Sequence, residues 1–120
     1  MAQGVLDVVA LPDPIGAVLS GSKRPNGLNI TKVRVPIGVI GIIFEARPNV
    51  TSDAASLCLK SGNTVILRGG KEAINSNKCI ADIMRSALEK SALDKNCIQL
   101  IEDTTRQSSV ELMGLSLIHI

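Results

Sequence analysis

Polar and cationic residues follow two apolar runs of this sequence, and their types suit the binding of negative charge. Arg47 and Asn49 come after the first run, where a helix is predicted to begin. A side-chain amide aimed at an oxyanion beside a helix N-terminus can lower a reaction barrier by about 3 kcal/mol. The second run is followed by two cations that flank a pair of glycines, namely Arg68, Gly69, Gly70 and Lys71. Such a segment suits a phosphate-bearing ligand, because glycines let it approach the backbone closely.

Each segment also has an interpretation that needs no ligand. Asn is a preferred residue at the N-cap of a helix, and this role alone would account for Asn49. Arg68 and Lys71 are equally compatible with an ordinary strand-to-helix connection that carries solvated charges. Spacing by itself leaves both pairs of alternatives open.

The three cysteines and the single histidine do not add a second reactive site. Cys58 is predicted to lie in the middle of a helix, on its apolar side and with no histidine near it in sequence, so we expect an inert core thiol. The same interpretation applies to Cys79 and Cys97. An odd number of cysteines without a CxxC pair is typical of reduced thiols in a cytoplasmic protein. His119 has no carboxylate or thiol at ligand spacing, so no metal site is predicted.

Alternating strands and helices are predicted to position the two polar segments. Strands are expected at residues 37–44, 64–67 and 97–101, with helices between them and a short helix at 108–113. This order is typical of an α/β fold, here an incomplete, Rossmann-like parallel sheet with crossover helices. Ligands of such sheets bind beyond the carboxyl ends of the strands. We therefore expect the two segments to lie at the same rim.

The two longer helices are predicted from their caps, charges and apolar spacing. Asn49 and Thr51 are candidate caps of the first helix, and its apolar stripe is Val50, Ala54, Leu57 and Cys58. The stripe of the second helix is Ile80, Ile83, Met84, Ala87 and Leu88. Its outer surface is expected to carry the ion pairs Lys78 with Asp82 and Arg85 with Glu89.

The first third of the chain has a different pattern. Val5, Val8 and Val9 repeat at helical spacing, and extended chain is expected from residue 24 to 36, with a turn at Asn26 and Gly27. The apolar residues of this stretch change faces, which predicts a bulge or a change of sheet near Lys32. Gly38 and Gly41 are expected inside a strand, where they would thin it for close packing, and they do not form a dinucleotide-binding glycine fingerprint.

Charge and hydropathy exclude two broad classes of function. A net charge of +2, with one aromatic residue in 120, does not favour a nucleic-acid partner. The longest apolar stretch, residues 35–44, is half the length that a membrane-spanning helix needs, which is about 20 residues. The composition instead favours a core of branched aliphatic residues in a helix-covered sheet.

Four stretches taken together resemble the gamma-glutamyl phosphate reductase family, also called glutamate-5-semialdehyde dehydrogenases, within the aldehyde dehydrogenase superfamily. The stretches are Arg-Pro-Asn-Gly-Leu from residue 24, Val-Arg-Val-Pro-Ile-Gly-Val-Ile-Gly from 33, Glu-Ala-Arg-Pro-Asn-Val-Thr from 45 and Ile-Leu-Arg-Gly-Gly from 66. Their order and spacing also match, and the resemblance runs from about residue 1 to 114.

The resemblance implies an NADPH-dependent reduction of L-glutamyl 5-phosphate to L-glutamate 5-semialdehyde, the second step of proline biosynthesis from glutamate. Asn49 matches the asparagine of the superfamily's oxyanion hole, and Arg47 beside it is assigned to substrate binding. Arg68 matches a lysine that reaches the adenosine ribose, and with Lys71 it would favour NADP over NAD. Gly69 and Gly70 complete the expected cofactor segment. The resemblance also implies a homo-oligomer, and it leaves a neighbouring glutamate 5-kinase as a further partner.

The family's catalytic cysteine is expected in a segment that this chain does not contain, so the chain alone is predicted to be inactive. Residues 1–34 are expected to lead in from a missing N-terminal part, and 35–114 to form a partial NADP-binding domain. Residues 116–120 resemble the translation of a sequencing adapter, and residues 115–120 are expected to be a non-native tail. Two alternatives stay open: a nucleotide-binding module without chemistry, and the reductase part of a bifunctional kinase-reductase synthase.

Overall fold

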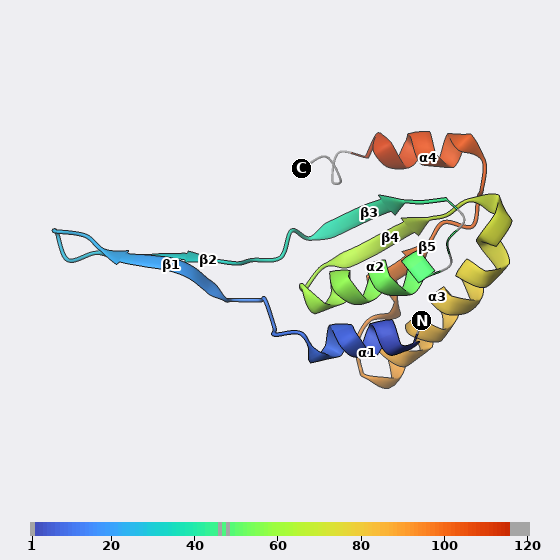
Figure 1. Ribbon diagram of the computed structural model, residues 1–120. Helices are drawn as coiled ribbons and strands as arrows, with labels where there is room; N and C mark the ends of the chain where they lie inside the picture. Colours follow the sequence, from blue (N-terminus) through green and yellow to red (C-terminus); the bar gives the residue numbers. More distant parts are fainter. Residues whose placement is uncertain (1, 46, 48, 116–120) are drawn as a thin grey trace.

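The computed structural model describes residues 2–45, 47 and 49–115, which form a small parallel sheet between helices and a long antiparallel arm (Figure 1). The helices are α1 (Ala2–Ala10), α2 (Asn49–Lys60), α3 (Ile74–Lys90) and α4 (Arg106–Met113). The strands are β1 (Val18–Lys23), β2 (Asn29–Val33), β3 (Val39–Ile43), β4 (Thr64–Arg68) and β5 (Ile98–Leu100). Short 3₁₀ turns lie at η1 (Lys71–Ala73) and η2 (Lys95–Cys97).

The parallel sheet has the order β3-β4-β5, with α2 and α3 as the crossover connections. The expected α/β fold is therefore confirmed. The last residues of β3 and β4 are paired, Ile43 with Arg68, so both strands end at the same level. This register brings the loops that follow the two strands to one rim.

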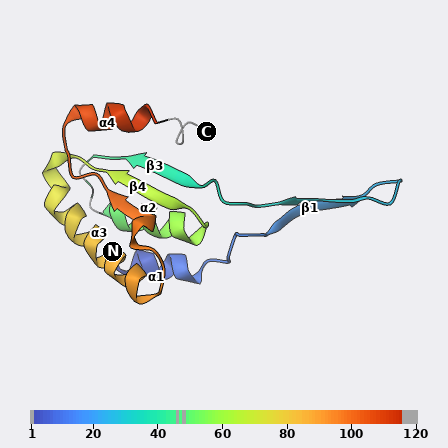
Figure 2. The same cartoon turned by 180° about the vertical axis from the view of Figure 1, so that it is seen from behind.

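The hydrophobic core lies on one face of this sheet. Alternate residues of β4, Val65 and Leu67, are completely buried together with Ile98 of β5, as the period of two in a strand requires. The core faces α2 and α3, with α1 packed on α2, whereas α4 lies on the opposite side of the sheet (Figures 1 and 2). Arg68 shares its strand face with Thr64 and Ile66, which is the α4 side.

Helix α2 buries small polar residues in addition to part of its predicted apolar stripe: Cys58 is buried and Ala54 packs against the core as expected, but Leu57 does not. Leu57 is half exposed, and the buried positions are Thr51, Ser52, Ala55, Ser56 and Cys58. Seryl hydroxyls can be buried here because each donates to a carbonyl one turn earlier: Ser52 to Asn49 at 3.0 Å and Ser56 to Asp53 at 3.0 Å. The helix can therefore lie close to the sheet without leaving these groups unpaired.

Helix α3 is longer than its predicted stripe and is used differently. Leu88 is buried and Met84 partly buried as expected, but Ile83 is 65% exposed, and Ala81 takes a core position instead. The predicted ion pairs along the helix are wrong as well. Lys78 pairs with Glu102 and Glu89 with Lys95, because residues after the helix fold back within reach of its surface.

The arm is a β-hairpin whose strands β1 and β2 are exposed along their whole length. The predicted turn at Asn26 and Gly27 is confirmed, with φ of +89° at Gly27. The predicted irregularity lies across from Lys32: Val18 pairs with Val33 and Ser20 with Lys32, so that Leu19 bulges out. Gly38 lies before β3 with φ of +123°, so its role is this backbone conformation and not the thinning of a strand.

None of the helices in the described part of the chain has the length and hydropathy to cross a bilayer.

Candidate functional site at the rim of the parallel sheet

The loops after β3 and β4 meet at the carboxyl rim of the sheet, as predicted. The Phe44 amide donates to the carbonyl of Arg68 at 2.9 Å, and the Gly70 amide donates to the carbonyl of Glu45 at 2.8 Å. These two bonds continue the β3–β4 ladder beyond the strands. The rim is therefore one connected surface and not two independent loops.

Asn49 begins α2 and is exposed at this rim. Its carbonyl accepts from Ser52, and the preceding Arg47 carbonyl accepts from the Val50 amide at 3.1 Å. None of the hydrogen bonds between described residues uses the Asn49 side-chain amide. Arg47 is exposed as well, while its neighbours 46 and 48 lie outside the described residues. An exposed amide at the N-terminus of a helix is suited to hold an oxyanion.

Arg68 bonds the segment that precedes α4 and the first turn of that helix. Its Nη2 donates to the carbonyls of Thr104 at 2.7 Å and Thr105 at 2.8 Å, and its Nε donates to Ser108 Oγ at 3.3 Å. The guanidinium fork thus bonds three acceptors at the start of α4. Arg68 holds α4 on the sheet, a role that the sequence did not reveal.

Asp103 stabilises the same turn before α4. The hydrogen bond from the Thr105 amide, 2.8 Å from Asp103 Oδ1, is the main reason why the pKa of this carboxyl is lowered, and the charge of Arg68 contributes in the same direction. Arg68 and Asp103 therefore fix the β5–α4 connection from two sides.

The two glycines after Arg68 are explained by packing within the protein. A Cβ at Gly69 would overlap Asn77 Nδ2 and lie 3.1 Å from ring carbons of Phe44. A Cβ at Gly70 would lie 3.0 Å from the Glu45 carbonyl oxygen. Packing within the protein by itself disfavours a side chain at either position, and the approach of a ligand to this backbone stays a prediction. Lys71 opens η1 and is exposed.

A hollow of about 680 Å³ lies at the rim, and it contains acidic groups that the sequence interpretation did not assign. Its lining residues are Ile43, Phe44, Glu45, Arg68, Gly70 and Glu72. Glu45 and Glu72 add two carboxylates to one guanidinium. Carboxylates accept hydrogen bonds from sugar hydroxyls. The sequence could have indicated Glu45 and Glu72, because each follows a predicted strand and lies in a loop that the topology brings to the rim.

Behind the rim, α2 and α3 are joined by a buried pair of polar side chains. Thr51 Oγ1 donates to Asn77 Oδ1 at 3.0 Å, and neither residue has any exposed surface. The prediction of Thr51 as a helix cap is therefore wrong. The sequence pattern did not predict that these two side chains are buried and bonded to each other, because the residue type of an asparagine or threonine does not tell whether it is buried.

The cysteines differ from one another. Cys58 is buried as predicted, and burial raises the pKa of its thiol, which keeps it protonated and unreactive. Cys97 is partly buried and packs against the core, as predicted, whereas Cys79 is exposed, so the core prediction is wrong for Cys79 alone. His119, for which no metal site is predicted, lies outside the described residues.

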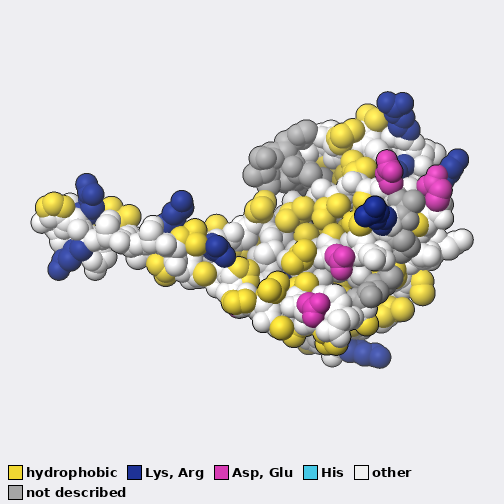
Figure 3. All heavy atoms as spheres, in the orientation of Figure 1, with side chains coloured by type: hydrophobic (Ala, Val, Ile, Leu, Met, Phe, Trp, Pro, Cys, Tyr) yellow, Lys and Arg dark blue, Asp and Glu magenta, His cyan; other side chains and the backbone are white. Residues whose placement is uncertain are grey.

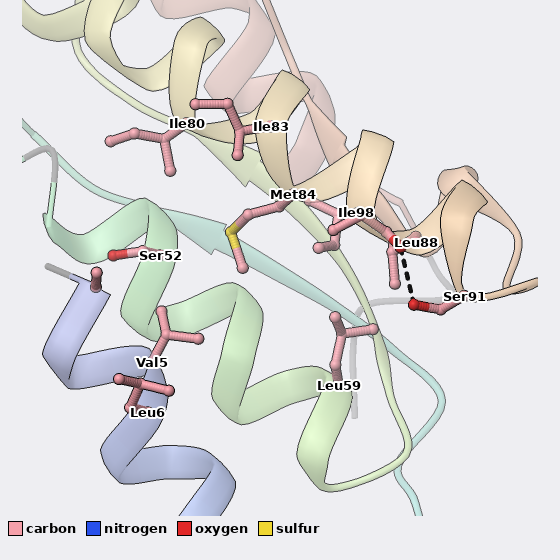
Figure 4. A pocket seen from close by; sticks show the side chains of 12 residues that line it. Val5, Leu6, Ser52, Leu59, Ile80, Ile83, Met84, Leu88, Ser91 and Ile98 are labelled. Atoms are coloured by element: carbon pink, nitrogen blue, oxygen red, sulfur yellow. Dashed lines mark hydrogen bonds between the residues drawn. The ribbon is translucent and has the colours of Figure 1, made fainter.

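A second hollow, also about 680 Å³, is an apolar groove between α1, α2 and α3 (Figure 4). Val5 and Leu6 form one wall, and Ile80, Ile83 and Met84 form the other. Among the described residues that line it, the only polar side chains are Ser52 and Ser91, and the hydroxyls of both donate to backbone carbonyls, Asn49 and Ala87 respectively.

Known proteins are similar to this chain in sequence and in fold. No family model matches the chain. It is 60% identical over 116 residues to the gamma-glutamyl phosphate reductase of Clostridium beijerinckii, a match that covers 97% of this chain and 28% of that protein. The chain therefore spans less than a third of the length of this curated relative.

Solved structures agree. The gamma-glutamyl phosphate reductase of Thermotoga maritima matches 94% of this chain, and 27% of its own, with a TM-score of 0.90 and 46% identity. An acetylating aldehyde dehydrogenase from Geobacillus thermoglucosidasius shares the fold alone, with a TM-score of 0.76 and 21% identity over 97% of this chain and 25% of its own. By sequence and by fold, the chain matches one stretch of the gamma-glutamyl phosphate reductases, and it shares the fold of aldehyde dehydrogenase structures.

Proposed function

We propose that this chain supplies one side of the active site of an NADPH-dependent reductase, which converts L-glutamyl 5-phosphate into L-glutamate 5-semialdehyde and phosphate. This reaction is the second step of proline biosynthesis from glutamate. One observation carries the proposal: in a chain 60% identical to a gamma-glutamyl phosphate reductase, the Asn49 and Arg68 loops are joined at one rim.

Asn49 is proposed to stabilise the oxyanion. When a nucleophile adds to the acyl carbon of the substrate, negative charge develops on its carbonyl oxygen. The Asn49 amide is exposed where α2 begins, so it can donate to that oxygen with support from the helix dipole. Arg47, also exposed at the rim, is proposed to bind the anionic substrate.

The cofactor segment is proposed to be Arg68, Gly69, Gly70 and Lys71, and the residues present fit a nicotinamide dinucleotide. Glu45 and Glu72 offer acceptors for ribose hydroxyls, and exposed Lys71 offers a cation for the 2′-phosphate of NADP. Arg68 already bonds three acceptors before α4, so we assign the selection of NADP chiefly to Lys71. The cofactor, when bound, supplies the hydride.

The nucleophile is proposed to come from outside these 120 residues, as the family resemblance implies. Cys58 does not fit the role, because it is buried in the core and its pKa is raised. We therefore propose that the chain alone does not turn over substrate. The whole protein is proposed to be a cytoplasmic homo-oligomer, with the exposed arm as a contact between copies.

A chimeric reductase tests this function. The 116 matched residues of the C. beijerinckii protein are replaced by those of this chain, and NADPH oxidation is followed with freshly generated glutamyl phosphate. We expect turnover by the chimera and none by the isolated chain. A folded chimera that is inactive, beside an active parent protein, would contradict the proposal, and turnover by the isolated chain would contradict the assignment of the nucleophile.

A further inference from the structure

Asn77 is a completely buried polar residue that the proposed mechanism does not use. Its Oδ1 accepts from Thr51 Oγ1, while its Nδ2 has no hydrogen-bond partner among the described residues. Turning the amide over would leave the oxygen unpartnered in place of the nitrogen. A buried amide with one unsatisfied end is costly, and such groups are retained where they serve a purpose that packing alone does not explain.

The surroundings of Asn77 connect three parts of the rim. Its amide fills the space that a side chain at Gly69 would need, and Phe44, at the end of β3, packs on the same glycine. Thr51 lies in the first turn of α2, two residues after Asn49. One buried side chain of α3 thus contacts the turn that carries Asn49 and adjoins the loop that carries the cofactor segment.

We infer that Asn77 is a positioning residue, which sets the place of Asn49 relative to the β4–α3 loop through its hydrogen bond with Thr51. This inference rests on the proposed function, because it concerns the oxyanion role of Asn49. Asn77 does not line the rim hollow, so it acts through Thr51 and not by touching a ligand. Its burial restricts it to one arrangement, as a positioning role requires.

The inference predicts a particular split of the kinetic constants. Loss of the Asn77–Thr51 bond lets the first turn of α2 shift, which weakens an interaction made in the transition state, so kcat falls. The KM for NADPH should change little, because the cofactor segment keeps its bonds to β3 through the Phe44 and Glu45 backbone.

A double-mutant cycle in the chimeric reductase tests this directly. We expect Asn77→Ala and Thr51→Val each to lower kcat about tenfold at equal folded fraction, and the double variant to lose no more than either single one. Thr51→Ser keeps the hydroxyl and should retain most of the activity. Ser76→Ala, at an exposed position of the same helix, is the matched control.

The possible outcomes distinguish a failure of the positioning role from a failure of the proposed function. An active chimera in which both single variants keep their kcat, or in which their effects simply add, would overturn the positioning role alone. An inactive parent chimera would overturn the proposed function and the inference with it. If Asn77→Ala fails to fold, the comparison of Thr51→Val with Thr51→Ser decides: equal kcat values overturn the inference and a tenfold difference supports it.

Discussion

Arg68 has a structural task whether or not it also contacts a cofactor. Its guanidinium bonds the carbonyls of Thr104 and Thr105 and the hydroxyl of Ser108. An ammonium group cannot reproduce this fork. We expect Arg68→Lys to lower the free energy of unfolding by about 1–2 kcal/mol and to speed hydrogen exchange in α4.

Hydrogen exchange with a control variant measures this effect. Lys71→Arg changes an exposed cation next to the same loop and should leave α4 protected. Unchanged exchange of α4 in Arg68→Lys would show that the three bonds do not hold the helix.

The cysteines are expected to react in the order of their exposure. Cys79 is exposed, whereas Cys58 is buried with a raised pKa, so an alkylating reagent at neutral pH should modify Cys79 and spare Cys58 until the chain unfolds. Peptide mass spectrometry of the treated chain locates the label. Rapid labelling of Cys58 in the folded chain would contradict its place in the core.

At this scale, sequence reasoning located the rim residues but not their contacts. Arg68 lies next to a predicted strand end and Asn49 lies at the predicted start of the helix after the other strand, and topology alone brings both to one rim. The partners of Arg68 lie 36 to 40 residues away, and most are backbone carbonyls that every residue has. Residue types therefore could not identify them.

At the scale of elements, the packing of the β4–α3 loop depends on Gly69. A methyl group there would overlap Asn77 and press on Phe44. Overpacking of this kind costs about 1–3 kcal/mol, so Gly69→Ala should lower the midpoint of thermal unfolding. Gly21→Ala is the control, because its Cβ would meet only Thr31 Cγ2 at an ordinary 3.4 Å and the Ile30 carbonyl oxygen at 3.7 Å. Equal midpoints for the two variants would contradict the described packing.

The turn before α4 should respond to acid through Asp103. Its pKa is lowered in the folded chain, chiefly by hydrogen bonds from Thr105, so its contribution is present above the pKa of about 3.9 of an unfolded carboxyl. That contribution is lost as pH falls through the lowered value. The protection of α4 against hydrogen exchange, taken relative to the intrinsic rate at each pH, should therefore fall below about pH 4, and Asp103→Asn should remove this step. If the change in α4 exchange with pH persists in Asp103→Asn, another titrating group causes it.

The order of elements was predictable from periodicity, but the faces of α2 and the first arm strand were not. Parallel strands of branched residues around β3 and β4 have a strong pattern. The buried face of α2 contains serines that satisfy their own hydroxyls, which hides it from a search for apolar residues. β1 is exposed on both faces and has no apolar alternation to detect.

At the scale of the whole molecule, the arm dominates the shape. The radius of gyration is 17.3 Å, against roughly 14 Å for a compact chain of this length, because the hairpin projects from the sheet domain (Figure 1). Residues 18–34 contain four cations and no acidic residue, and Figure 3 shows cationic and apolar groups along the arm. An exposed strand pair of this kind suits pairing with another chain.

The arm therefore provides a test of assembly. In the chimeric reductase, Ile30→Lys replaces an exposed apolar residue of β2 with a charge and should shift the protein toward smaller species. Analytical ultracentrifugation measures the change. Ile83→Lys, at a similarly exposed site on α3, is the control. If both variants show the same distribution of oligomeric species, the arm is not a contact between copies.

Asn49 is proposed to stabilise negative charge at a rim that it shares with the cofactor segment, and the kinetics of Asn49→Ala in the chimeric reductase test this role most directly. We predict that kcat falls about 10²–10³-fold while the KM for NADPH changes little, since one oxyanion donor contributes this much. Asn75→Ala, at an exposed asparagine of α3, should behave as the parent protein. A folded Asn49→Ala chimera with the kcat of its parent would contradict the account.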